Sequence, residues 1–162
     1  MKVSEIMTAS PTCCAPTDSL REVAQIMRAC DCGAVPVVQD DRVVGIVTDR
    51  DLAIRAVAEG KSADTKVSEV LTASPCCCSP NEDVDEVSRT MSEKQIRRVV
   101  IVDASGCCVG IVSQADLARA AQTGSQLSDR EVGIVVERIS EPQQASNSSS
   151  APPASAEPAA RT

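Results

Sequence analysis

The sequence predicts a mixed α/β (α+β) protein made of two copies of one β-α-β-β-α unit. The first observation is an internal repeat. Val3-Ser4-Glu5 returns 64 residues later as Val67-Ser68-Glu69, and Gly45-Ile46-Val47 returns 65 residues later as Gly110-Ile111-Val112. The second is that each repeat alternates a segment with helical apolar spacing and two runs rich in Val and Ile. Because the register is kept along the whole repeat, we interpret it as a duplication.

Each repeat opens with a short, cysteine-containing extended stretch that ends at a proline, Pro16 or Pro80. A helix is expected to follow, with Thr17 or Asn81 as its N-cap. The apolar residues of this helix recur at helical spacing: Leu20, Val23, Ala24 and Met27 in the first repeat, and Val84, Val87 and Met91 in the second.

Two apolar strands are expected after this helix. Polar turn residues separate the two runs in each repeat, and a final helix begins at Asp49 or Gln114. The β-branched content indicates strands that are covered on one or both faces. The strands are predicted over 35–39, 43–48, 98–103 and 108–113.

The C-terminal part differs from the repeats. A further helix is expected over 129–139, with Val132, Val135, Val136 and Ile139 on one face. Residues 141–162 contain no Val, Ile, Leu or Met, so we predict a disordered tail. The predicted organisation is repeat one over 1–62, repeat two over 63–124, a helix over 125–140 and the tail over 141–162.

The composition excludes several classes of protein. The chain has 16 Lys and Arg against 23 Asp and Glu, a net charge of −7, and no His, Phe, Trp or Tyr. Without His there is no Ser-His-Asp or Cys-His catalytic arrangement and no His-bearing metal site. An acidic chain without aromatic residues lacks the usual means of binding nucleic acid. No apolar run approaches the ~20 residues that span a bilayer, and the N-terminus lacks signal-peptide features, so a cytoplasmic protein is expected.

Nine cysteines include three adjacent runs, Cys13-Cys14, Cys76-Cys77-Cys78 and Cys107-Cys108. Adjacent side chains of a strand point to opposite faces, so neighbours seldom share a metal or a disulfide. We interpret most of these thiols as small buried apolar residues. Reversible oxidation and a soft-metal site remain alternatives, although the spaced Cys pairs of zinc sites are absent.

Each repeat carries a hydroxyl residue and an aspartate where a strand turns into a helix, Thr48-x-x-Asp51 and Ser113-x-x-Asp116. One interpretation is a capping box, which satisfies the free amides of the helix start. The other is ligand contact, because such an aspartate can accept both hydroxyls of a ribose. The helix N-terminus also favours an anion. The two roles can coexist.

These repeats resemble a tandem pair of CBS domains, also called a Bateman module. The resemblance spans about residues 3–122 and rests on segments 33–38, 45–52, 96–102 and 110–117. It implies two repeats packed around a pseudo-two-fold axis, often in a dimeric disc, with AMP, ADP, ATP, S-adenosylmethionine or NADH bound in clefts between them. A stand-alone, non-catalytic sensor is therefore expected, as a homodimer without catalytic residues, catalytic cofactor or metal. The regulated partner is not identified by the sequence.

The resemblance also implies two nucleotide sites, each combining the aspartate of one repeat with the opening segment of the other. The arginine pair 97–98 is assigned to the first site, so we predict that this site prefers phosphate-bearing nucleotides. The second site, uncharged at 33–34, is expected to favour an uncharged or cationic adenosyl compound. The first site comprises Thr48, Arg50, Asp51, Thr72, Cys76, Cys77, Arg97 and Arg98. The second comprises Thr8, Thr12, Cys13, Cys14, Gly33, Ala34, Ser113 and Asp116.

Overall fold

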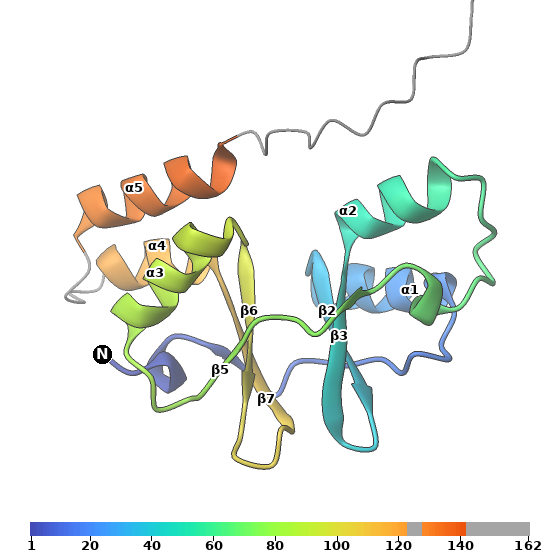
Figure 1. The fold of residues 1–162 in the computed structure, drawn as a ribbon, viewed down its shortest axis with the longest axis horizontal. Helices are drawn as coiled ribbons and strands as arrows, with labels where there is room; N and C mark the ends of the chain where they lie inside the picture. Colours follow the sequence, from blue (N-terminus) through green and yellow to red (C-terminus); the bar gives the residue numbers. More distant parts are fainter. Residues whose placement is uncertain (123–127, 142–162) are drawn as a thin grey trace, which may run out of the picture.

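The computed structural model describes residues 1–122 and 128–141, and it has two halves that correspond to the two repeats (Figure 1). The first repeat contains η1 (Val3–Glu5), β1 (Thr8–Ala9), α1 (Leu20–Cys30), β2 (Ala34–Gln39), β3 (Arg42–Thr48), α2 (Asp49–Asp51) and η2 (Leu52–Val57). The second contains η3 (Val67–Glu69), β4 (Thr72–Ala73), β5 (Cys77–Cys78), α3 (Val84–Lys94), β6 (Arg98–Val102), β7 (Cys108–Ser113) and α4 (Gln114–Gln122). The C-terminal helix is α5 (Asp129–Ser140). The predicted element order is confirmed.

The two repeats exchange their opening strands. One sheet has the order β1-β7-β6-β5 and the other β2-β3-β4, so β1 joins the sheet of the second repeat and β4 joins that of the first. Both exchanged pairs are antiparallel, with Thr8 opposite Ile111 and Thr72 opposite Ile46. Each repeat thus supplies an edge strand to the other.

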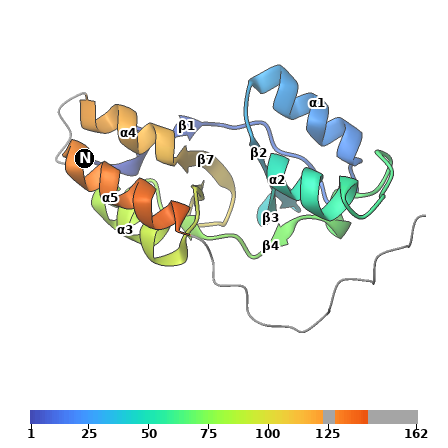
Figure 2. The ribbon, with the colours of Figure 1, turned by 90° about the horizontal axis from the view of Figure 1, so that it is seen from above.

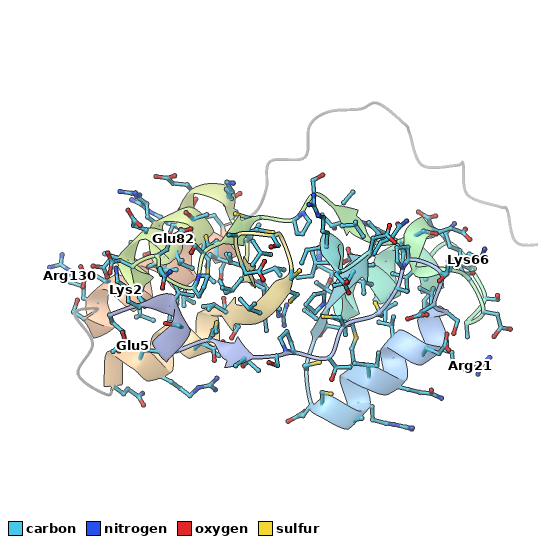
Figure 3. The ribbon with its side chains drawn as sticks, turned by 90° about the horizontal axis from the view of Figure 1, so that it is seen from below. Lys2, Glu5, Arg21, Lys66, Glu82 and Arg130 are labelled. Atoms are coloured by element: carbon cyan, nitrogen blue, oxygen red, sulfur yellow. The ribbon has the colours of Figure 1, made fainter. Side chains whose placement is uncertain are left out.

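The exchange extends to the termini of the repeats. The amide of Val3 donates to the carbonyl of Glu82 at 3.0 Å, and that of Val67 donates to the carbonyl of Asp18 at 2.8 Å. Figure 3 shows Lys2 and Glu5 near Glu82 at one end of the molecule, and Arg21 and Lys66 at the other. The opening segment of each repeat therefore lies against the helix start of its neighbour.

Two apolar cores follow from this arrangement. Val3, from the first repeat, is fully buried in the core of the second. Val67 and Val70 are buried in the core of the first repeat. Each half therefore completes its core with residues of the other repeat.

The cysteines fill the core less than predicted. Cys14 and Cys78 are buried, but Cys30 and Cys77 are exposed and the other five are partly exposed. The interpretation as buried apolar residues is therefore wrong for most of them, because their segments run along sheet edges and turns.

The helix caps differ from the prediction by two residues. The N-cap of α1 is Ser19, whose hydroxyl accepts from the amide of Glu22, and that of α3 is Asp83. Thr17 instead lies in a turn that Asp18 stabilises by accepting from the amide of Ala15 at 2.8 Å. In the first repeat the expected final helix continues from α2 as the π-helix η2.

The C-terminal helix α5 packs across α3 and α4 (Figure 2). It buries Val132, Val135 and Ile139 against the core of the second repeat. Val136, predicted on the same face, is 37% exposed because it lies past the edge of this stripe. The predicted disordered tail lies, from residue 142, outside the described residues. No described helix has the length and apolar character needed to cross a membrane.

Candidate functional site

Both Ser/Thr-x-x-Asp motifs form capping boxes. The amide and hydroxyl of Thr48 donate to Asp51 Oδ2 at 2.9 and 2.7 Å, and the Asp51 amide donates to Thr48 Oγ1 at 3.2 Å. Ser113 and Asp116 repeat the pattern at 2.7, 2.7 and 3.3 Å. These hydrogen bonds hold each aspartate side chain at the point where the strand, β3 or β7, ends and the next helix begins.

The second oxygen of each carboxylate faces an arginine of the same helical segment. Arg55 Nη1 lies 3.4 Å from Asp51 Oδ1, and Arg119 Nη2 donates to Asp116 Oδ1. Asp116 is only 7% exposed. Since a carboxylate oxygen can accept more than one hydrogen bond, Oδ1 retains capacity for a ligand hydroxyl beside the arginine. Capping and ligand contact are therefore compatible in this geometry.

Asp116 lines a cavity of about 500 Å³ between the two repeats. The cavity exists because β1 pairs with β7, which brings the opening segment of the first repeat over the helix start of the second. It is lined by Thr8, Ala9, Ser10, Pro11, Thr12, Cys30, Asp31, Cys32, Gly33, Ala34, Arg98, Ile111, Ser113, Ala115, Asp116 and Arg119. Six of the eight residues assigned to the second site therefore come together here. The other two, Cys13 and Cys14, are not among the lining residues.

Arg98 also lines the Asp116 cavity, which corrects the charge assigned to the two sites. A Cβ atom on Gly33 would lie 2.8 Å from Arg98 Nη2 and 2.7 Å from Asp49 Oδ2. Because Gly33 has no side chain, the guanidinium of Arg98 occupies the space beside it. The site, for which no basic residue was predicted at 33–34, thus contains the cations Arg98 and Arg119 beside the carboxylates of Asp31 and Asp116.

At the other aspartate, Arg55 joins the two repeats. Its Nη1 donates to the carbonyl of Val70 at 2.9 Å and to Thr72 Oγ1 at 3.1 Å, besides its ion pair with Asp51. Thr48, Asp51 and Thr72 of the first predicted site are therefore brought together. Arg55 was missed, although its spacing of four residues from Asp51 is typical of helical ion pairs.

The remaining residues of the first predicted site have other contacts. Cys76 Sγ lies 3.4 Å from Lys94 Nζ, and Cys77 Sγ donates to the carbonyl of Pro75. Arg50 and Arg97 are exposed. These contacts do not link the four residues to Asp51.

The thiols of Cys13 and Cys108, from different repeats, donate to the carbonyls of Pro11 at 3.4 Å and of Gly110 at 3.7 Å. The nearby Cys108 thiol lowers the pKa of Cys13, and Cys13 together with burial raises the pKa of Cys108. Burial raises the pKa of Cys14 and of Cys78 to about 12, which keeps both neutral. Within 1–122 and 128–141, no three His, Cys, Asp or Glu side chains are grouped to hold a metal ion.

Comparison with known proteins identifies the repeat. The family model for the CBS domain matches residues 3–57 and again 67–123. The CBS domain-containing protein YhcV of Bacillus subtilis is 36% identical over 138 residues, covering 85% of this chain and 94% of that protein. Hypoxic response protein 1 of Mycobacterium tuberculosis is 38% identical over 117 residues, covering 71% of this chain and 81% of that protein.

Solved structures share the fold. The CBS domain pair of protein MJ0100, in complex with 5-methylthioadenosine and S-adenosyl-L-methionine, has a TM-score of 0.70 at 29% identity, covering 76% of this chain and 97% of that one. Hypoxic Response Protein I with two coordinated zinc ions has a TM-score of 0.66 at 36% identity, covering 74% of this chain and 98% of that one. Both likenesses span most of the described residues.

Proposed function

The chain belongs to the CBS domain family as a tandem pair of repeats, and from this premise we propose that it is a regulatory module that binds an adenosine-containing ligand and catalyses no reaction. The MJ0100 pair, crystallised with two adenosyl compounds, is a relative of similar extent. The chain has no Gly-rich phosphate loop and no His to activate its thiols, so the sequence displays no activated nucleophile.

The observation that carries this proposal is the cavity at Asp116. Its volume of about 500 Å³ is within the range of small-molecule sites. A carboxylate at a helix start accepts ribose hydroxyls, and the lining hydroxyls of Thr8 and Ser113 add further partners. Arg98 and Arg119 supply charge-assisted donors for a phosphate. We therefore assign AMP, ADP or ATP to this site ahead of a cationic adenosyl compound.

Calorimetry with AMP, adenosine and S-adenosylmethionine tests the ligand class. Arg98→Ala is expected to weaken AMP binding about 10- to 150-fold and adenosine binding much less, since one charge-assisted contact to phosphate is lost. Arg97→Ala is the matched control, because this exposed neighbour is not a lining residue. Equal losses for AMP and adenosine would contradict phosphate recognition by Arg98.

The aspartate is tested in the same way. Asp116→Asn is expected to weaken every ribose-bearing ligand, while Asp51→Asn alters the equivalent cap in the other repeat and leaves this cavity intact. An AMP site that disappears with Asp51→Asn and persists with Asp116→Asn would overturn the assignment. We retain the site at Thr48, Asp51 and Thr72 as a second proposal, in which Arg55 donates to the Thr72 hydroxyl as well as pairing with Asp51.

A thiol-based sensor is the second candidate, favoured by the lowered pKa of Cys13, which the Cys108 thiol of the other repeat causes. With hydrogen peroxide as oxidant, the two thiols form a disulfide and peroxide is reduced to two water molecules. Mass spectrometry after peroxide treatment tests it: a Cys13–Cys108 crosslink is expected, and Cys30→Ser is the control that leaves it unchanged. A zinc site stays the alternative for these thiols, tested by zinc titration of the reduced protein.

Two further expectations accompany the proposal. We propose a homodimer, because an isolated module leaves apolar helix surface exposed. We also propose a reducing compartment such as the cytoplasm, in which the nine cysteines of the sequence stay reduced.

A further inference from the structure

Arg98 of the Asp116 cavity faces a carboxylate that is not itself a lining residue. A Cβ atom on Gly33 would lie 2.8 Å from Arg98 Nη2 and 2.7 Å from Asp49 Oδ2, so both atoms border the same small space. Arg98 begins β6 of the second repeat, whereas Asp49 begins α2 of the first. Because Arg98 lines the cavity and Asp49 does not, Asp49 lies beyond the guanidinium as seen from the cavity.

Local hydrogen bonds hold Asp49 in this position. Its Oδ1 accepts from the amide of Arg50 at 2.8 Å, and its own amide donates to the carbonyl of Gly33 at 3.2 Å. Oδ2 is therefore left to face Arg98. Asp49 thus fixes a negative charge beside the guanidinium.

The guanidinium of Arg98 remains available to a ligand. Arg119, the other cation of the cavity, already donates to Asp116 Oδ1. Among residues 1–122 and 128–141, Arg98 makes no ion pair, and Asp49 lies too far from it for a direct salt bridge. Arg98 is therefore the cation whose charge a ligand phosphate can neutralise.

The charges at this end of the cavity suit a ligand with few phosphates. Arg98 and Arg119 line the cavity together with two carboxylates, Asp31 and Asp116, and Asp49 adds a third behind Arg98. With the ribose assigned to Asp116, a first phosphate reaches Arg98 and a longer phosphate chain continues toward Asp49. There the added phosphates meet a charge of the same sign, which repels them.

The second repeat lacks this carboxylate. Gln114, 65 residues after Asp49, is the corresponding residue, and it begins α4 as Asp49 begins α2. A helix therefore starts at this position of the repeat without a charge. The negative charge beside Arg98 is a property of the first repeat alone.

We propose that Asp49 restricts the Asp116 cavity to nucleotides with a single phosphate, because its carboxylate repels the further phosphates of ADP and ATP. This inference rests on the proposed function and names the ligand within the proposed class. AMP is expected to bind more tightly than ATP, with ADP between them. Asp49 is a specificity-determining residue, whereas Asp116 and Arg98 bind the parts that all three nucleotides share.

Calorimetry with AMP and ATP in the presence of EDTA tests this selection. Wild type is expected to bind AMP at least about tenfold more tightly than ATP. Asp49→Asn keeps the shape of the side chain and removes its charge. It is expected to tighten ATP binding about tenfold and AMP binding about threefold or less. Asp49→Gln, which copies the second repeat, is a second variant with the same expectation.

Asp85→Asn is the matched control, since it makes the same change of charge at an exposed position of α3 that does not line the cavity. Its ratio of AMP to ATP affinity is expected to equal that of wild type. Far-ultraviolet circular dichroism checks that the variants fold.

The outcomes separate this inference from the proposed function. If wild type binds AMP but the ratio of AMP to ATP affinity is the same in both Asp49 variants, the role of Asp49 is wrong and the nucleotide site stands. If wild type binds no adenine nucleotide, both are wrong. The titrations are repeated with Mg²⁺: ATP binding that requires Mg²⁺ and is lost in Asp49→Asn would show that Asp49 attracts the metal ion of Mg–ATP, and would overturn the selection against ATP.

Discussion

At the scale of single residues, each motif aspartate combines two roles. Asp116 Oδ2 caps its helix while Oδ1 meets Arg119, and Asp51 does the same with Arg55. The cap holds the carboxylate in place without a ligand, so binding does not require the side chain to be ordered first. Such preorganisation reduces the entropy lost on binding.

Gly33 controls the position of Arg98, so Gly33→Ala is expected to weaken AMP binding. The added Cβ would lie 2.8 Å from Arg98 Nη2, and the guanidinium must move. Calorimetry is expected to show a loss of about tenfold for AMP and a smaller loss for adenosine, because Arg98 is displaced from the phosphate that only AMP carries. Gly133→Ala, with open space around its Cβ, is the control for ligand affinity.

Cys13 is expected to be alkylated faster than Cys14 or Cys78 near pH 8. The thiolate is the form that reacts. The Cys108 thiol lowers the pKa of Cys13, whereas burial raises the pKa of Cys14 and of Cys78 to about 12. The alkylation rate of Cys13 is expected to reach its plateau at a lower pH than the rate of an ordinary thiol, because a thiol of lower pKa is fully ionised at a lower pH.

Cys108→Ala removes the thiol that lowers the pKa of Cys13 and is expected to slow alkylation of Cys13, whereas Cys107→Ala is the neighbouring control. Peptide mass spectrometry after timed iodoacetamide treatment measures the rates. An unchanged Cys13 rate in Cys108→Ala would exclude the proposed thiol pair.

At the scale of elements, local sequence explains most helix starts. Ser19-x-x-Glu22 and Ser128-x-x-Glu131 form the capping boxes of α1 and α5, and both were readable as Ser-x-x-Glu in the sequence. α3 lacks such a motif, and its N-cap Asp83 makes no side-chain cap bond. The N-cap of α3 is therefore expected to stabilise its helix less than the N-cap of α1 does, although the two repeats are related.

Ser19→Ala is expected to lower the free energy of unfolding by about 1 kcal/mol, because the amide of Glu22 loses its acceptor. Asp83→Ala is the matched control, expected to cost about 0.5 kcal/mol or less, since it removes only an exposed ion pair with Lys2. Urea denaturation followed by far-ultraviolet circular dichroism measures both, as the chain has no aromatic fluorophore. Equal costs would show that the Ser19 cap does not stabilise α1.

At the scale of the whole molecule, the exchanged opening segments make the two halves interdependent. The core of the first repeat includes Val67 and Val70, and that of the second includes Val3. The Asp116 cavity lies at this exchange, where β1 meets β7. A ligand there contacts both repeats at once, which gives it a means to stabilise one relative arrangement of them.

Val67→Ala is therefore expected to lower the free energy of unfolding of the whole chain by about 2 kcal/mol, because buried methyl groups are lost and a cavity is left behind. A single cooperative transition is expected for the wild type and for both Val67→Ala and Val3→Ala. Ser68→Ala, at an exposed neighbouring position, is the control. Two separate transitions in urea would contradict the coupling of the repeats.

The sequence by itself determined the duplication, the order of helices and strands, and the pairing of each hydroxyl residue with its aspartate. These depend on apolar periodicity and on hydrogen bonds between residues three or four positions apart, which the sequence displays directly. Only the tertiary structure decided that Arg98 lines the Asp116 cavity, that Arg55 binds Thr72 of the other repeat, and that α5 packs on the second repeat. Those contacts join residues distant in the chain, and their formation depends on which strands exchange and on where a glycine leaves room for a long side chain.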